Sequence, residues 1–350
     1  MPSDRGSATD PRAGHDELLS GLDEASLIAR VRRRLPAAPA WLVVDIGDDA
    51  AVYEPPRNQL EVITTDAVID GVHVDRRFVP AQAIGHRAIA VNLSDLAAMG
   101  AAPRLLTLSL ALPADLTLDD FDGLVDGALA LADRAGARLV GGNLTRTPGP
   151  LSVDVTAVGT VHRRRILRRT GARPGDHIFV SGNPGDARAG LAVLLELGAG
   201  GRDAWTALAA HYLQPEPRID LGRALASSGA VSAAIDLSDG LADGLRRLTD
   251  AHGLGCRIEA ARLPVSDGAR QFWQLRQRDA MAETLAGGDD YELLFTARPK
   301  SARRLAAALK TVAGAAVTRI GSVTRERGCW LVDAQGGRTP IAGGYDHFSR

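Results

Sequence analysis

The sequence predicts an α/β (α+β) protein of two domains, and three observations support this. The chain has 350 residues, long for one hydrophobic core, and its 45% hydrophobic and 24% charged residues suit a globular protein. Short apolar, β-branched runs alternate with segments of helical periodicity through the first half. A second such series follows an arginine-rich connection. We expect domains over residues 16–161 and 162–350, and a mobile tail over 1–15.

The elements of the first half are assigned from periodicity. Helical spacing of apolar residues predicts helices over 17–35, 81–99 and 116–136, and Gly100 ends the second of them as a C-terminal glycine does. Apolar, β-branched runs predict strands within 41–52, 60–74, 104–113, 138–142 and 151–161.

The second half repeats the alternation. Strands are predicted within 177–182, 232–240, 255–259, 291–297, 318–323 and 329–334, and helices within 186–198, 240–253, 281–288 and 301–309. A turn at Asn183, Pro184 and Gly185 joins the first strand to the first helix. Such a glycine loop is either a tight turn or a group of backbone N–H donors that holds an anion.

Overall charge and cysteine usage exclude several classes of function. The net charge of −1 provides no positive field for nucleic acid or for an anionic membrane surface. No run approaches the roughly 18 apolar residues that span a bilayer, and the first 15 residues lack the apolar segment of a secretory signal. Cys256 and Cys329 form neither a disulfide framework nor a zinc motif. We expect a cytoplasmic protein.

Acidic residues beside glycines or at the ends of apolar runs are the candidate functional residues. They lie in five segments: Asp48 and Asp49, Asp66 and Asp70, Asp95, Asp236 and Asp239, and Asp289 and Asp290. Taken singly, each segment also suits a turn, a helix surface or a helix cap. Taken together, buried carboxylates need a positive partner.

That partner is predicted to be magnesium. Lys300 and Lys310 are the only lysines, both in a stretch that suits solvated helix positions, and the chain has no P-loop. Magnesium takes carboxylate, hydroxyl and phosphate oxygens. Hydroxyl residues accompany the acids: Thr64, Thr65, Ser94 and Ser238. Metal-assisted phosphoryl transfer is therefore the expected chemistry.

Seven motifs make the chain resemble the thiamine-monophosphate kinases, within the aminoimidazole ribonucleotide synthetase-like fold family. They span residues 45 to 348 and read GDDAAV, TTDAVIDGVHV, AVNLSDLAAMGA, VSGNPGDARAGL, AIDLSDGLADGL, GGDDYELLF and GYDHF. The resemblance implies an N-terminal domain whose sheet pairs across a homodimer and a C-terminal α/β domain with a mixed sheet. It also implies ATP as co-substrate, several Mg²⁺ ions, and direct transfer of the γ-phosphate to thiamine monophosphate to give thiamine diphosphate and ADP.

The resemblance carries over residue by residue and implies no catalytic side chain. The implied metal ligands are Asp49, Thr64, Thr65, Asp66, Asp95, Asn143, Asp236 and Asp239. The implied ATP contacts are Gly142, Asn143, Arg169 and Ser238. The implied contacts with thiamine monophosphate are His73, Asp289 and Tyr345, the last through its ring.

Three positions depart from the family pattern. Asn143 stands where the family has an acid, Asp289 where it has Glu, and Val74 where it has Phe. An amide at 143 holds magnesium less tightly than a carboxylate, so we expect an active enzyme with a raised magnesium requirement. Two alternatives stay open at this point: another ATP-dependent enzyme of the same fold family, or a nucleotide-binding protein without turnover.

Overall fold

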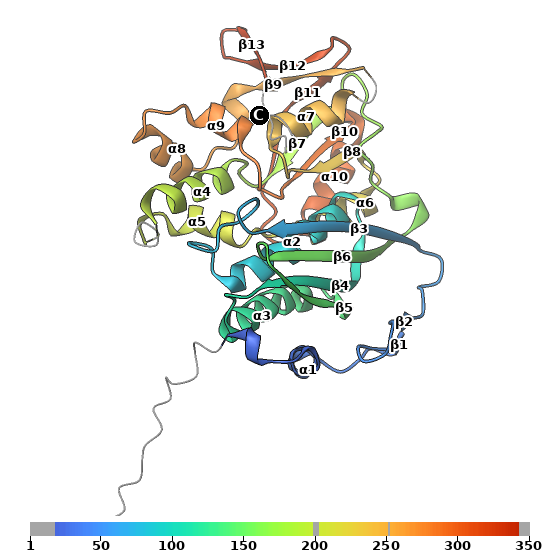
Figure 1. Ribbon diagram of the computed structural model, residues 1–350. Coiled ribbons are helices and arrows are strands. Elements are labelled where there is room, and N and C mark those ends of the chain that lie inside the picture. The colour runs from blue at the N-terminus through green and yellow to red at the C-terminus, as the bar shows by residue number, and fades with distance from the viewer. Residues whose placement is uncertain (1–17, 199–202, 251–252, 343–350) are drawn as a thin grey trace, which may run out of the picture.

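The computed structural model describes residues 18–198, 203–250 and 253–342, which form two domains, each with a mixed β-sheet at its centre (Figure 1). The predicted fold class is confirmed. The predicted tail at 1–15 lies outside the described residues, and so does Tyr345.

The N-terminal domain has a four-stranded sheet in the order β3-β6-β4-β5. Its strands are β3 (Leu60–Ile69), β4 (Ala102–Pro113), β5 (Arg138–Thr147) and β6 (Ser152–Val161). The β4 and β5 strands are parallel, and the other pairs are antiparallel. Helices α2 (Ala81–Ala98) and α3 (Leu118–Arg134) cover one face. These elements confirm the strands and helices predicted for this part of the chain.

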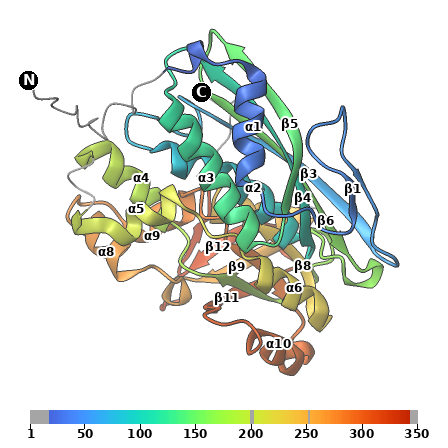
Figure 2. The same cartoon turned by 90° about the horizontal axis from the view of Figure 1, so that it is seen from below.

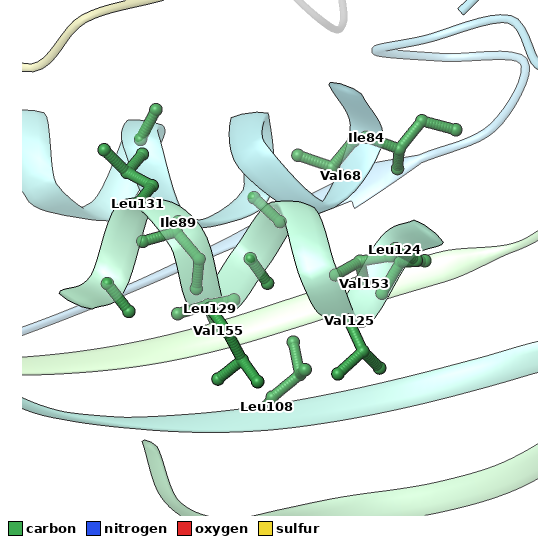
Figure 3. Packing of buried hydrophobic residues seen from close by; sticks show 14 of the residues in the cluster. Val68, Ile84, Ile89, Leu108, Leu124, Val125, Leu129, Leu131, Val153 and Val155 are labelled. Carbon is green, nitrogen blue, oxygen red and sulfur yellow. The ribbon is translucent and has the colours of Figure 1, made fainter. Parts of the chain in front are cut away.

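Helix α2 is the most buried element of this domain. Its sequence has no polar face, which is typical of a helix enclosed on all sides. The core between the helices and the sheet is mainly aliphatic: Ile84 and Ile89 of α2 belong to the same buried cluster as Val153 and Val155 of β6 (Figure 3). Removing such side chains from water is the main driving force for folding of the domain.

The outer face of the four-stranded sheet is only partly covered. Strands β1 (Leu42–Val44) and β2 (Val52–Tyr53) form a small hairpin, and Leu42 packs against Val140 and Val158 there. Ile63 of β3, on the same outer face, is 72% exposed.

The first predicted helix, 17–35, begins later than expected. Helix α1 covers Glu24–Arg34, because the Asp23 side chain accepts a hydrogen bond from the Ser26 N–H and caps the helix there. A 3₁₀ turn, η1 (Leu19–Gly21), precedes it. Helix α1 lies beside α3, where Arg30 forms a bidentate pair with Asp122 (Figure 2).

The C-terminal domain has a seven-stranded sheet in the order β13-β12-β9-β11-β7-β10-β8. Only β9 and β12 are parallel. The strands are β7 (His177–Ser181), β8 (Val231–Asp236), β9 (Gly255–Glu259), β10 (Leu293–Ala297), β11 (Val317–Thr324), β12 (Gly328–Val332) and β13 (Arg338–Pro340).

Helices cover both faces of this sheet. One face packs against α7 (Leu241–Asp250) and α9 (Ala280–Ala286), and the other against α6 (Ile219–Ser228) and α10 (Ala302–Leu309). A side cluster is formed by α4 (Asp186–Leu197), α5 (Thr206–Leu213) and α8 (Asp267–Gln274). The short 3₁₀ helices are η2 (Arg163–Arg165), η4 (Asp203–Trp205), η5 (Ala260–Arg262) and η6 (Pro299–Ser301). Helices α5, α6 and α8 and strand β13 were not predicted from the sequence.

Helix α2 also joins the two domains. Ala97 and Ala98 at its end pack against Leu221 and Leu225 of α6. The same helix contacts β8 of the C-terminal sheet. One helix thus belongs to the core of the first domain and to the boundary with the second.

Two glycines allow α2 and α3 to pack closely. A Cβ added at Gly127 would lie 1.9 Å from the Gln82 carbonyl oxygen, and one added at Gly85 would lie 1.9 Å from that of Leu124. Gly123, one turn earlier on α3, would meet nothing nearer than 3.5 Å.

We predict that Gly127→Ala lowers the free energy of unfolding by about 1–3 kcal/mol, because the helices must separate. Gly123→Ala is the matched control and should raise it by up to about 1 kcal/mol, the gain in helix propensity. Urea titrations followed by circular dichroism measure both. Equal effects of the two variants would contradict this account of the packing.

Candidate active site

A cleft of about 880 Å³ lies between the two domains. Its walls come from β3 and the segment that follows it, from α2, α4 and α5, from the loop before α7 and from the loop after α9. Acidic side chains lie near one another in the cleft, and apolar side chains also line it. The acids are Asp66, Asp95, Asp236 and Asp239, and the apolar residues include Val72, Phe78, Leu191 and Leu195.

The fold explains how distant acids reach the same cleft. Asp66 pairs with Val155 of β6 and shares its face of the sheet, the face covered by α2. Asp95 comes from α2 itself, and Asp236 is the last residue of β8. Asp239 lies in the short loop before α7. The two domains therefore contribute two acids each.

Hydrogen bonds orient three of these carboxylates. The Ser94 hydroxyl donates to Asp236 Oδ2 at 2.8 Å, and the Thr64 hydroxyl donates to Asp95 Oδ2 at 2.5 Å. Arg247 Nη2 donates to Asp239 Oδ2 at 2.9 Å.

Burial and mutual repulsion disfavour the ionised form of two of the acids. Burial, followed by the charge of Asp95, raises the pKa of Asp236 from 3.8 to about 7. Partial removal of the Asp66 carboxylate from water, with the charges of Asp95 and Asp239, raises its pKa to about 6. A cation in the cleft would reverse both shifts, because it favours the charged carboxylate.

The donor set fits magnesium better than a softer metal. All four side chains offer oxygen, and hydroxyl groups stand beside them. Within the described residues, no group of three or more His, Cys, Asp and Glu side chains is already gathered tightly enough to hold an ion. Such an open arrangement suits Mg²⁺, which keeps several waters and takes the remaining ligands from substrate phosphates.

Arginines supply the positive charge in the cleft. Arg87, Arg169 and Arg188 line it, whereas Lys300 and Lys310 are exposed and do not. The prediction that the lysines are solvated is confirmed. Arg188 also pairs with Glu283, through Nε and Oε2 at 2.5 Å.

Two loops of the C-terminal domain lie side by side at the cleft. The Asp289 N–H donates to the Ser238 carbonyl at 2.7 Å, and the Tyr291 N–H donates to the Leu237 carbonyl at 2.9 Å. The motifs DLSDG and GGDDY are therefore held together by backbone hydrogen bonds. This pairing brings Ser238 and Asp289 to the same wall.

The alternatives for the Asn183–Gly185 turn are resolved by Asp290. Its carboxylate accepts hydrogen bonds from the Gly185 N–H, at 2.9 and 2.8 Å, and from the Ala187 N–H at 3.3 Å. The loop thus holds a carboxyl group of the same chain, and burial raises the pKa of this carboxyl well above its usual value. Asp290 caps α4 and is unavailable for metal binding.

The other predicted site residues are divided between the cleft and the surface. Arg169, Ser238, His73 and Asp289 line the cleft. Thr64 reaches it through its bond to Asp95. The residues that do not line the cleft of their own chain are Asp49, Thr65, Gly142 and Asn143, all exposed. Thr65 and Asn143 lie on the outer face of the sheet, opposite Thr156 and Ser109 respectively.

Arg87 and Tyr212 line the cleft and were not predicted. Arg87 is 1% exposed, and Tyr212 is 2% exposed. The sequence signal for Arg87 is a single guanidinium within the apolar stretch of α2, which requires a buried acceptor. Tyr212 lies in α5, a helix that was not predicted.

Comparison with known proteins places this geometry in a family. The family model described as "AIR synthase related protein, N-terminal domain" matches residues 47–161, and the corresponding C-terminal model matches 173–332. The thiamine-monophosphate kinase of Escherichia coli (strain K12) is 40% identical over 334 residues, which cover 93% of this chain and 98% of the relative. This chain belongs to the thiamine-monophosphate kinase family.

Solved structures of the family agree with this assignment. The thiamine-monophosphate kinase of Stenotrophomonas maltophilia K279a has a TM-score of 0.80 at 37% identity, covering 91% of this chain and 98% of that one. AaThiL, complexed with AMPPCP and TMP, has a TM-score of 0.74 at 31% identity, covering 94% and 98%. Among the described residues, no helix is both long and apolar enough to cross a bilayer.

The raised pKa of Asp236 predicts how stability depends on pH in metal-free protein. Because the folded-state pKa of about 7 exceeds the unfolded value of 3.8, the folded chain binds the extra proton, and stability falls as pH rises through this window. Between pH 5 and 8 in a chelator, the melting temperature should fall more for the wild type than for Asp236→Asn. Added Mg²⁺ should stabilise the wild type more at pH 8 than at pH 5.

The matched control is Asp220→Asn, whose side chain is 84% exposed. The melting temperature of this variant should depend on pH as that of the wild type does. If the melting temperature of Asp236→Asn also follows the wild-type pH dependence, ionisation of the Asp236 carboxyl does not destabilise the folded protein.

Proposed function

We propose that this protein is a kinase that transfers the γ-phosphate of ATP to thiamine monophosphate, giving thiamine diphosphate and ADP. The observation that carries the proposal is that acidic and apolar side chains line the same interdomain cleft, in a chain of this family. The acidic side chains suit polyphosphate with its divalent ions, and the apolar side chains suit a heterocycle. The complex of AaThiL with AMPPCP and TMP supports both ligands.

We assign the residues that would hold Mg²⁺ as Asp66 and Asp95 from the first domain and Asp236 and Asp239 from the second. Magnesium held by these side chains would supply positive charge to neutralise the charge that develops on phosphate oxygens. Ser94, Thr64 and Arg247 keep three of the carboxylates in fixed orientations. Arg169 and Ser238, in the wall of the same cleft, are assigned to ATP.

Direct transfer is favoured over a covalent intermediate on the protein. Among the described residues, Ser238 is the serine and His73 the histidine that line the cleft, and the His73 ring accepts a hydrogen bond from the Ile69 N–H at 3.1 Å. The acceptor is itself an anionic phosphate, so it needs no strong general base. The protein's contribution is to position two phosphates in line and to balance their charge.

The direct test is incubation of the purified protein with ATP, Mg²⁺ and thiamine monophosphate, followed by chromatography of the thiamine species. Thiamine diphosphate is the expected product. A different phosphorylated product would favour another enzyme of this fold, and tight ATP binding without product would favour a non-catalytic protein.

We predict that Asp95→Asn lowers the rate of thiamine diphosphate formation by a factor on the order of a hundred or more, because transition-state charge is then less well neutralised. The variant should keep the wild-type circular dichroism spectrum, since Asn can still accept from Thr64. Asp126→Asn, which removes an exposed acid that pairs with Arg34, is the control and should retain full activity. An active Asp95→Asn variant would contradict the assigned role.

We also propose a cytoplasmic homodimer that forms through the outer face of the four-stranded sheet. The exposed Ile63 on this face supports the proposal. So does the exposure of Asp49, Gly142 and Asn143, which stand at positions that the family resemblance assigns to the site yet do not line the interdomain cleft of their own chain. In such a dimer we assign these three residues to the cleft of the second copy.

We predict that light scattering gives twice the chain mass of 36.8 kDa, and that Ile63→Glu gives the single mass. Burying a charge at a dimer interface is strongly unfavourable, which is the reason for the expected dissociation. Leu275→Glu is the matched control, because Leu275 is 68% exposed at the end of α8, away from this face. Dimers of both variants would exclude the proposed face.

A further inference from the structure

We propose that Arg87 is a positioning residue that holds both walls of the thiamine monophosphate subsite, through Asp289 on one side and Tyr212 on the other. This inference rests on the proposed function and assigns a role to a residue that the family motifs do not include. Arg87 comes from α2, Tyr212 from α5, and Asp289 from the loop before β10.

Arg87 is the most deeply buried cation of the cleft. Its side chain is 2% exposed, and it lies between partners from the C-terminal domain. Nη2 donates to Asp289 Oδ1 at 2.8 Å, and Nη1 donates to the Tyr212 carbonyl oxygen. The guanidinium also lies over the Tyr212 ring, 4.4 Å from its centroid. A buried guanidinium with a fixed fork of donors holds its partners in one geometry.

Asp289 is held in an uncommon backbone conformation. Its φ is +66°, and that of Tyr291 is +51°, both in the left-handed region that non-glycine residues rarely adopt. The Tyr291 hydroxyl donates to Asp289 Oδ1 at 3.0 Å, so this oxygen accepts from Tyr291 as well as from Arg87. Backbone strain of this kind persists only where surrounding contacts over-determine it. Here the contacts with Arg87 and Tyr291 do so.

The second oxygen of Asp289 has no hydrogen-bond donor among the described residues, and the side chain is 36% exposed in the cleft wall. Because Oδ1 is occupied twice, Oδ2 remains as a fixed acceptor for a ligand. An N–H donor is the complementary group. The aminopyrimidine of thiamine monophosphate carries such a donor, and the apolar residues of the cleft suit its ring.

The other partner of Arg87 reaches the segment that carries His73. The Tyr212 hydroxyl donates to the His73 carbonyl oxygen at 3.0 Å. Burial raises the pKa of Tyr212 to about 12, so the hydroxyl keeps its proton at neutral pH. Arg87 thus contacts Asp289 directly and the His73 segment through Tyr212. Both are positions where the family contacts its substrate.

The predicted signature of Arg87→Met is a KM for thiamine monophosphate that rises roughly ten- to hundred-fold, the usual cost of losing a charged hydrogen bond. The KM for ATP and kcat should stay within about threefold, because the acids of the metal site do not contact Arg87. Arg87→Lys keeps the charge but reaches one partner at a time, so it should give an intermediate KM. Calorimetric titration with thiamine monophosphate alone should show the same order of affinities.

Arg138→Met is the matched control. Arg138 is a second buried arginine and is 7% exposed. Like Arg87, it donates one hydrogen bond to a backbone carbonyl, that of Pro36, and one to a carboxylate, that of Asp45, at 2.8 Å. As in Arg87, its Nε has no partner among the described residues. Its loss should lower stability to a similar degree while leaving the KM for thiamine monophosphate within about twofold of the wild type.

Several outcomes would overturn the proposal while leaving the proposed function intact. They are an equal rise of both KM values, a loss of kcat alone, or the same KM change in Arg138→Met. If Arg87→Met does not fold, Tyr212→Phe provides the test, since it keeps the ring over Arg87 and removes only the bond to His73. It should raise the same KM by several-fold, and an unchanged KM would reject the inference. A wild-type protein that forms no thiamine diphosphate would instead reject the function.

Discussion

Electrostatic repulsion among four carboxylates at a domain boundary is the constraint on which the site depends. Asp66, Asp95, Asp236 and Asp239 share one cleft with few compensating cations, and the raised pKa values of Asp66 and Asp236 record the cost. A structure retains such a cost where a ligand relieves it. Divalent cations bound in the cleft would relieve it, whereas the two lysines of the chain are exposed and do not line the cleft.

Helix α2 connects this constraint to the rest of the fold. The helix is enclosed by the four-stranded sheet, α3 and α6, so its side chains have little freedom. Near its end, Ser94 donates a hydrogen bond to Asp236, and Asp95 is itself one of the four acids. Arg87, two turns earlier, donates to Asp289. One rigid element therefore fixes the distance between the acids and the contacts of Arg87. In-line transfer between two bound phosphates requires such a fixed distance.

Much of this could be predicted from the sequence, and the failures have physical reasons. Acids such as Asp66 and Asp236 are visible in the sequence because they follow apolar, β-branched runs, although Asp66 lies within β3 and not at its end. Asp290 looked equivalent, but only the fold shows its carboxylate on the N–H groups of the 183–187 loop. The contact between Arg87 and Asp289 spans 202 positions, so no local pattern reveals it. The start of α1 depended on Asp23, a capping residue inside a longer periodic run. The exposed positions of Asp49 and Asn143 could not be foreseen, because motif matching does not show toward which face of the fold a side chain points.

The central claim is that these four carboxylates bind divalent cations. The most direct measurement is anomalous scattering from crystals grown with Mn²⁺ and a non-hydrolysable ATP analogue, because manganese prefers the same oxygen ligands as magnesium. The account predicts anomalous peaks within coordination distance of Asp66, Asp95, Asp236 and Asp239. Analogue density without any manganese peak beside these side chains would contradict it.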